Sequence, residues 1–159
     1  VNALKWFISE VFPLVRKEIP DVQLTLIGKN PPDWLNNYKN LGVKVVGYVD
    51  KVQPYLNNAS VYIAPLFVGG GIRIKILEAM AMELPVVASP VSAEGITANS
   101  ENGLFIANNR EDFARNIINL CKDYETTHSL GKSAREYVTK EFSWEKNVKI
   151  MLDEYKKLI

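Results

Sequence analysis

The sequence is poor in the residues that bind metals or form disulfide bonds. It holds one cysteine, Cys121, and one histidine, His128, so no disulfide can form within the chain and the common zinc ligand sets cannot be assembled. It has no Asp-x-Asp pair to hold a divalent ion. No apolar run reaches the roughly 18 to 20 residues of a membrane-spanning helix, and no segment resembles a secretion signal. A lone cysteine is typical of a reducing compartment, and we therefore expect a cytoplasmic protein.

The chain also lacks an excess of charge of either sign. Its 19 Lys and Arg residues balance 18 Asp and Glu residues, for a net charge of +1. Such a chain has no overall field to attract nucleic acid, so we predict no nucleic-acid partner. Any anion that the protein binds must be held by a local cluster of residues.

Short apolar segments alternate with helical patterns along most of the 159 residues. We expect strands at residues 22–28, 43–48, 60–65, 85–88 and 103–107, and helical segments at 2–18, 73–83 and from 109 onward. This alternation predicts an α/β fold, a doubly wound Rossmann-like parallel sheet with helices on both faces and a helical C-terminal tail. We treat residues 1–159 as a single domain. Because the chain opens on a helix, we expect it to lack the first strand of the domain and to be a piece of a longer protein.

A glycine-rich block follows the third predicted strand. Gly69, Gly70 and Gly71 precede Arg73 and Lys75 in "GGGIRIK". Loops after strands of a doubly wound sheet are where ligands bind, and we expect the next helix to begin near residue 71 or 72, with free amides at its start. Together these groups predict a phosphate or diphosphate site. The spacing matches neither a Walker loop nor a dinucleotide fingerprint, and a turn with a purely structural role remains an alternative.

Glu78 lies in the middle of the apolar segment "KILEAMAM". A carboxylate there is costly unless it is paired or hydrogen-bonded. One interpretation is a surface ion pair with Lys75, three residues earlier. The other is a carboxylate that accepts hydrogen bonds from the two adjacent hydroxyls of a ribose. We expect the core-facing stripe of this helix to consist of four apolar residues: Ile74, Leu77, Ala81 and Leu84.

The block "GGGIRIKILEAMAMELPVVASPVSAEGI", with "VVGYVDKVQPYLNNASVYIAPL" before it, resembles the C-terminal, donor-binding domain of retaining glycosyltransferases of the GT-B fold, closest to family 4. The similarity runs from about residue 2 to residue 145. It implies two Rossmann-like domains that face one cleft, of which this chain supplies the half that binds a nucleotide-diphosphate sugar. The N-terminal, acceptor-binding domain would lie outside this chain.

The resemblance also assigns roles to residues. The glutamate at the place of Glu78 holds the ribose hydroxyls in such enzymes, and Glu94 matches a position near the donor. Backbone amides of the glycine loop lie near the sugar and diphosphate: Gly70, Gly71 and Ile72. Backbone groups of the turn after the second strand frame the base: Gly47, Tyr48 and Val49.

Two departures from the family pattern affect these expectations. Many members carry a further glutamate eight positions before the one at Glu78, and here that place is Gly70. Many also carry a lysine-glycine pair at the start of the first helix, where this chain reads "VNALKWF". We expect Arg73 and Lys75 to supply the missing charge and to stabilise the diphosphate as it leaves.

The resulting prediction is a hexosyltransferase domain that takes a UDP-, GDP- or ADP-sugar and transfers its sugar, with retention and without a metal or other cofactor, to a polysaccharide or lipid-linked glycan. The isolated domain should be inactive, and the full-length protein could associate peripherally with the inner face of a membrane. A non-catalytic nucleotide-binding module on the same fold is the main alternative. A nucleotide-sugar epimerase is less consistent with the sequence, because this half offers no histidine and carboxylate cluster.

Overall fold

The computed structural model describes residues 2–157, and it begins with one long helical segment. α1 (Asn2–Trp6), η1 (Phe7–Val11) and α2 (Phe12–Glu18) follow one another without a break, and η1 is a single π-helical stretch. The segment matches the helix predicted at residues 2–18. Phe7, Val11 and Val15, spaced four residues apart, are buried on one face of the segment.

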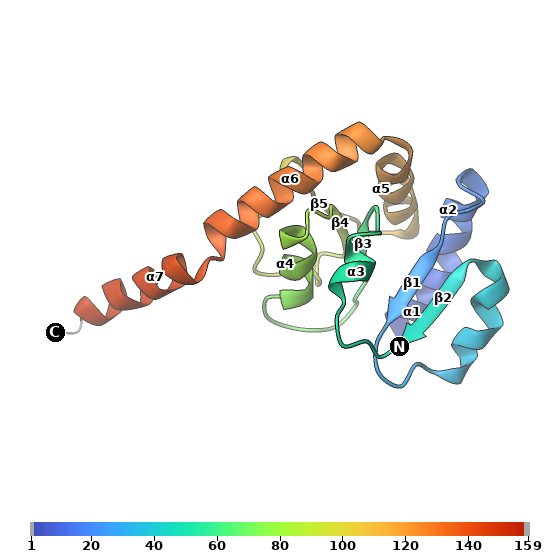
Figure 1. Cartoon of the computed structure of the whole chain (residues 1–159), viewed down its shortest axis with the longest axis horizontal. Helices are drawn as coiled ribbons and strands as arrows, with labels where there is room; N and C mark the ends of the chain where they lie inside the picture. Colours follow the sequence, from blue (N-terminus) through green and yellow to red (C-terminus); the bar gives the residue numbers. More distant parts are fainter. Residues whose placement is uncertain (1, 158–159) are drawn as a thin grey trace.

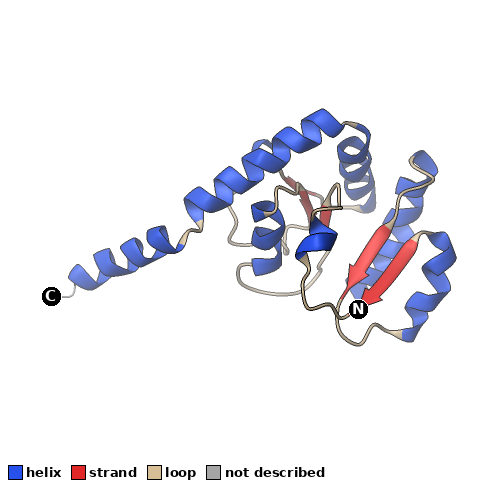
Figure 2. Cartoon of the chain, viewed as in Figure 1, coloured by secondary structure: helices blue, strands red, loops and turns tan. Residues whose placement is uncertain are grey.

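All five predicted strands are present and parallel, each ending within two residues of its predicted bounds. β1 (Leu24–Ile27) pairs with β2 (Val43–Gly47). β3 (Tyr62–Ala64), β4 (Val86–Ala88) and β5 (Leu104–Ile106) form a second sheet in the order β3-β4-β5. The strands therefore belong to two parallel sheets rather than the single sheet that we predicted, and Figure 2 shows them as two separate sets of arrows.

Helical segments connect and cover these strands (Figure 1). Between the strands lie η2 (Asp33–Leu41), α3 (Gln53–Leu56), α4 (Ile74–Ala81) and η3 (Ser100–Asn102). α5 (Arg110–Lys122), α6 (Tyr124–Glu141) and α7 (Trp144–Lys156) complete the described chain. The helices lie on both sides of the strands and the C-terminal part is helical, so the predicted fold class is confirmed.

Two clusters of buried apolar side chains hold these layers together. One cluster joins the long N-terminal helix and α5 to both sheets, and includes Leu24 of β1 and Val87 of β4. The other joins α4 and α6 to the second sheet. All three residues of β4 are fully buried, as expected for the central strand of a parallel sheet with both faces covered.

α4 is rotated relative to our prediction. Ile74, predicted to face the core, is 67% exposed, whereas Ile76, Ala79 and Met80 are buried. The prediction was wrong for Ile74, whereas Leu84 of the same predicted stripe is buried and Leu77 packs against the core. Because α4 carries apolar side chains on most of its circumference, periodicity alone did not select the buried face, and packing against α6 and the second sheet decided it.

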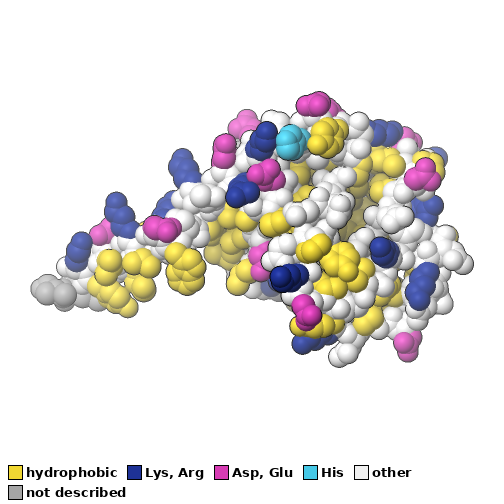
Figure 3. Space-filling view, in the orientation of Figure 1, with side chains coloured by type: hydrophobic (Ala, Val, Ile, Leu, Met, Phe, Trp, Pro, Cys, Tyr) yellow, Lys and Arg dark blue, Asp and Glu magenta, His cyan; other side chains and the backbone are white. Residues whose placement is uncertain are grey.

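α7 extends away from the rest of the molecule (Figure 1). Ser143 caps its first turn by accepting a hydrogen bond from the amide of Lys146. No residue of α7 is buried, and large apolar side chains gather on one side of it (Figure 3). They include Trp144, Val148, Met151, Leu152 and Tyr155. Among residues 2–157, no helix is both long enough and apolar enough to cross a membrane.

Candidate functional site

The loop between β3 and α4 is anchored near its start by two buried serines. The hydroxyl of Ser89 donates to the carbonyl oxygen of Leu66 at 2.5 Å, and the amide of Leu66 donates to the hydroxyl of Ser92 at 3.1 Å. The two serine hydroxyls are themselves 2.9 Å apart. Ser89 and Ser92 follow β4, so these bonds tie the glycine loop to the loop of the neighbouring strand. The backbone N–H and C=O of Leu66 therefore both have hydrogen-bond partners.

Two further contacts fix the middle and the end of this loop. The ring of Phe67 packs edge-on against Trp6 of α1, with ring centroids 5.1 Å apart. At the other end, the side chain of Ile72 lies against Gly95, where a Cβ would be 2.8 Å from Ile72 Cγ1. Gly95 also has φ of +78°, a conformation that glycine adopts without strain. The loop that carries Glu94 is therefore in contact with the end of the glycine loop, through Gly95 and Ile72.

Arg73 lies at the junction of the glycine loop and α4. We expected the helix to begin near residue 71 or 72, but it begins at Ile74 with Arg73 as its N-cap residue. The amides of Gly70, Gly71 and Ile72 accordingly belong to the loop rather than to the first helical turn. The Arg73 guanidinium packs over Gly69, and its Nε and Nη2 atoms are buried without a hydrogen-bond partner. Among residues 2–157, no carboxylate forms an ion pair with it.

Glu78 and Lys75 form a surface ion pair. Lys75 Nζ lies 2.7 Å from Glu78 Oε2, with 70% of the lysine side chain and 41% of the glutamate side chain exposed. This is the pairing that the sequence offered as the first interpretation of Glu78. Burial, and to a lesser degree the negative charge of Glu78, raises the pKa of the Tyr62 hydroxyl. Glu78 thus occupies a half-exposed place beside β3, where a ligand could compete with Lys75 for it.

The turn after β2 presents an aromatic ring and a cation at the same edge of the first sheet. Gly47 has φ of +83°, and its carbonyl oxygen accepts a hydrogen bond of 2.9 Å from the amide of Gly28. The glycines are followed by Tyr48 and Lys29, and the Lys29 ammonium lies 4.7 Å from the centre of the Tyr48 ring. Tyr48 is 61% exposed. Val49, the last residue assigned to this turn, is half-buried.

Comparison with known proteins identifies the family. A sequence profile described as "Glycosyl transferases group 1" matches residues 1–123. The chain belongs to the group 1 glycosyltransferases. It is 32% identical over 126 residues to an uncharacterized glycosyltransferase of Methanocaldococcus jannaschii, covering 77% of this chain and 31% of that protein. It is 25% identical over 156 residues to an uncharacterized 44.6 kDa protein in the cps region of Klebsiella pneumoniae, covering 92% of this chain and 40% of that protein.

Solved glycosyltransferases share the fold of this chain. The crystal structure of TarM matches 94% of this chain and 32% of its own with a TM-score of 0.82 at 23% identity. That of Anabaena HepE in complex with UDP matches 99% of this chain and 46% of its own, with a TM-score of 0.78 at 18% identity. The resemblance to the GT-B fold is confirmed. The chain spans less than half the length of these proteins and of the two relatives above.

In this glycosyltransferase chain, the predicted site residues fall into two groups, one around the glycine loop and one at the turn after β2. Arg73 packs over Gly69, and Gly95, next to Glu94, lies against Ile72, whereas the turn at Gly47 belongs to the other sheet. Sequence reasoning missed Ser89, Ser92, Lys29 and Trp6. The serines had a signal, because two hydroxyls three residues apart follow an apolar strand and can bond both to each other and to a nearby backbone. Trp6 and Lys29 acquire their roles only through contacts across the fold.

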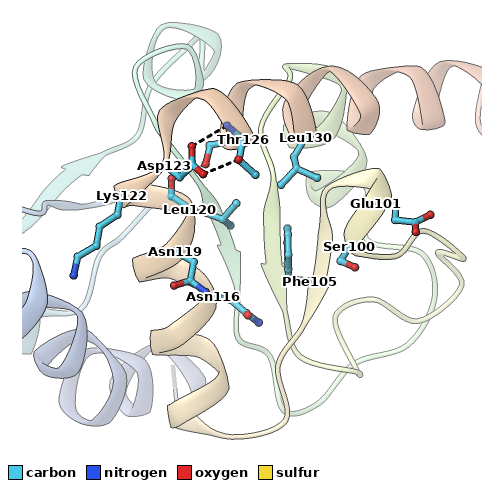
Figure 4. A pocket seen from close by; sticks show the side chains of 11 residues that line it. Ser100, Glu101, Phe105, Asn116, Asn119, Leu120, Lys122, Asp123, Thr126 and Leu130 are labelled. Atoms are coloured by element: carbon cyan, nitrogen blue, oxygen red, sulfur yellow. Dashed lines mark hydrogen bonds between the residues drawn. The ribbon is translucent and has the colours of Figure 1, made fainter.

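Two cavities lie away from these loops. The larger cavity, of about 560 Å³, lies between α5, α6 and η3, near the beginning of β5 (Figure 4). Phe105, Leu120 and Leu130 form its apolar part, and Asp123 at its rim caps α6 by accepting hydrogen bonds from Thr126. The smaller cavity, of about 290 Å³, lies between the N-terminal helix and η2. No predicted site residue lines either cavity. Among residues 2–157, no cluster of three or more His, Cys, Asp or Glu residues could hold a metal ion.

Proposed function

We propose that this chain is the donor-binding part of a glycosyltransferase, which holds a nucleoside-diphosphate sugar at the loop between β3 and α4. The observation that carries the proposal is Arg73, a cation set into the glycine loop with two buried donor nitrogens, Nε and Nη2, that lack hydrogen-bond partners. A buried unsatisfied donor on a charged group is costly, and a diphosphate supplies both the missing acceptors and the opposite charge. In a group 1 glycosyltransferase, a donor diphosphate is the anion that such a loop would meet.

Solved neighbours support a nucleotide donor and favour uridine among UDP-, GDP- and ADP-sugars. HepE was crystallised with UDP and with UDP-glucose, and a TarM variant with UDP and a GlcNAc-glycerol. By the same analogy we propose that the acceptor is a polysaccharide or lipid-linked glycan, bound mainly by an N-terminal domain beyond this chain. The complete enzyme would work in the cytoplasm and associate peripherally with the membrane that carries such acceptors. This chain alone would bind donor without transferring sugar.

The proposed reaction places developing negative charge at the loop. As the bond between sugar and diphosphate breaks, charge grows on the leaving oxygen, and fixed donors near it stabilise the transition state more than the ground state. The amides of Gly70, Gly71 and Ile72 and the guanidinium of Arg73 would supply these donors. When Glu78 accepts the ribose hydroxyls, Lys75 would be released from its ion pair and could turn toward the diphosphate. We propose retention of configuration and no metal requirement, with Glu94 positioned beside the sugar.

The ribose role of Glu78 can be tested separately from its ion pair. Glu78→Ala should weaken UDP binding by about 10-fold or more, because a carboxylate loses two charge-assisted hydrogen bonds. The same substitution should leave the affinity for 2′,3′-dideoxy-UDP unchanged, since that ligand lacks both hydroxyls. Lys75→Ala removes the ion pair together with the proposed diphosphate contact, so as a comparison it should weaken UDP and the dideoxy analogue equally. Titration calorimetry on the full-length protein gives all six affinities. Equal losses for UDP and the dideoxy analogue in Glu78→Ala would contradict the ribose contact.

A non-catalytic nucleotide-binding module is the second candidate. Gly70 stands where many members of the family place a glutamate, so the side chain expected beside the sugar is absent. The discriminating experiment incubates the full-length protein with UDP-glucose and follows the release of UDP with and without a glycan acceptor. UDP release above that of Arg73→Ala supports the enzyme. Tight binding of UDP-glucose without any turnover over a panel of donors and acceptors supports the module.

A further inference from the structure

The larger cavity has an aromatic ring in its wall that the packing of the helices leaves uncovered. Val87 of β4 pairs with Phe105 of β5, so these two side chains lie on the same face of the second sheet. α5 packs against β4, and Val87 is fully buried in the cluster that includes α5. Phe105 lies one strand further out, on the outermost strand of this sheet, and is only half-buried. Its side chain therefore lines the space that α5 and α6 leave between them (Figure 4).

Two carboxamides line the same space. Asn116 and Asn119 are three residues apart on α5, and this spacing places both side chains on one face of the helix, beside the cavity. Asn116 is half-buried and Asn119 is exposed, and neither side chain hydrogen-bonds to any group of residues 2–157. Each carboxamide can both donate and accept hydrogen bonds. The cavity thus combines an apolar wall with neutral groups that are free to bond a ligand.

The charged side chains around the cavity are engaged elsewhere. Lys122 extends away from the cavity toward the N-terminal helix, where its ammonium lies 3.0 Å from the carboxylate of Glu18 (Figure 4). Asp123 caps α6, and its two carboxylate oxygens accept hydrogen bonds from the amide and the hydroxyl of Thr126. The remaining charge is the anion of Glu101 on η3. The described lining, within residues 100–130, therefore offers no free cation to a phosphate or carboxylate.

We propose that this cavity is a second ligand site, which binds a neutral saccharide. A pyranose ring carries C–H groups on its faces, which the negative face of an aromatic ring attracts, and hydroxyls at its edge, which carboxamides can both donate to and accept from. An acyl chain would leave the carboxamides without partners, and an anionic ligand would meet no free cation. The volume of about 560 Å³ lies within the roughly 300–1,000 Å³ of small-molecule sites.

The position of the cavity separates it from the donor loop. β3, β4 and β5 are parallel. The cavity lies beside η3 and the beginning of β5, at the amino ends of these strands, whereas the glycine loop leaves the carboxyl end of β3. A saccharide bound in the cavity is therefore not the reacting end of an acceptor. In terms of the proposed function, on which this step rests, it is a distant part of a growing glycan, and holding it raises the effective concentration of that glycan at the active site.

Binding of short glycans to the complete protein tests the site. The neutral probes are cellotetraose, maltotetraose and tetra-N-acetylchitotetraose, and tetragalacturonate is the charged comparison. Titration calorimetry should show binding of at least one neutral probe. Asn116→Ala combined with Asn119→Ala should weaken that binding by about 10-fold or more, because two groups that hydrogen-bond the ligand are lost. Phe105→Leu, which keeps an apolar side chain without the ring, should weaken it by about 3- to 10-fold.

The controls separate this site from a loss of folding and from the donor site. Asn37→Ala, at an exposed asparagine of η2, is the matched control and should leave every affinity unchanged. Thermal unfolding and UDP affinity should be the same in all these variants as in the wild type. Equal affinity of the double variant and the wild type for the neutral probe would overturn the proposal. So would a failure of all three neutral probes to bind, or tighter binding of tetragalacturonate than of each neutral probe. The glycan titrations contain no nucleotide, so a failure to bind UDP would count against the proposed function alone.

Discussion

The guanidinium of Arg73 occupies the space that a side chain at position 69 would need. Nη2 of Arg73 lies 1.4 Å from where a Cβ on Gly69 would be. A side chain at position 69 would therefore displace the guanidinium from its place in the loop. This contact holds the positive charge inside the loop that follows β3, next to the amides that we assign to the donor diphosphate.

Gly69→Ala should consequently act like the loss of Arg73. The added methyl group forces the guanidinium to move, and we expect UDP affinity to fall about 10- to 100-fold, the equivalent of losing charge-assisted hydrogen bonds. Gly70→Ala should weaken binding less, because nothing lies within 4 Å of a Cβ at that position. Titration calorimetry of both variants beside Arg73→Ala provides the comparison. Wild-type affinity in Gly69→Ala would show that the placement of Arg73 is irrelevant to the ligand.

The buried serine pair should support both stability and binding. Ser92→Ala removes the acceptor of the Leu66 amide and a partner of Ser89, so we expect the free energy of unfolding to fall by about 1–3 kcal/mol. The loop that Leu66 anchors should become more mobile, and nucleotide affinity should fall with it. Urea denaturation measures the first effect. Ser129→Ala, at an exposed position of α6, is the control and should be close to neutral. A neutral Ser92→Ala would mean that water replaces the lost hydroxyl without cost.

Tyr62 should make the fold sensitive to high pH. Burial first, and the charge of Glu78 second, raise the pKa of its hydroxyl above the ordinary tyrosine value of 10.0. Its contribution to stability is complete below the ordinary value and is lost as the pH rises through the folded-state pKa, because the unfolded chain releases the proton first. Tyr62→Phe should therefore lose less stability between neutral and strongly alkaline pH than the wild type, in denaturation curves measured across that range.

The role of Glu78 in this shift has its own measurement. Glu78→Gln should lower the pKa of Tyr62 only part of the way toward its ordinary value, since burial is the larger cause. Ultraviolet titration of tyrosinate, with Tyr62→Phe subtracted, isolates the single group. An unchanged titration in Glu78→Gln would place the carboxylate too far from Tyr62 to affect it.

Much of the architecture followed from the sequence because the signals were local. Short apolar segments alternating with helical patterns predicted five strands, and the helical pattern over residues 2–18 predicted the N-terminal helix. The motif around Glu78 identified the glycosyltransferase family. α4 was the exception, since it is apolar nearly all round and two stripes, one through Ile74 and one through Ile76, compete for the core.

The sequence by itself determined the fold class, the family and the position of the glycine loop, because each depends on residue types at short, fixed spacings. Only the tertiary structure decided how the loop is held: Phe67 against Trp6, Leu66 between Ser89 and Ser92, Ile72 on Gly95. It also decided that Arg73 precedes α4 rather than lying within it, that Glu78 pairs with Lys75, and that the strands form two sheets. These features arise from contacts between residues far apart in the chain, whose energies depend on packing and burial that no local spacing encodes.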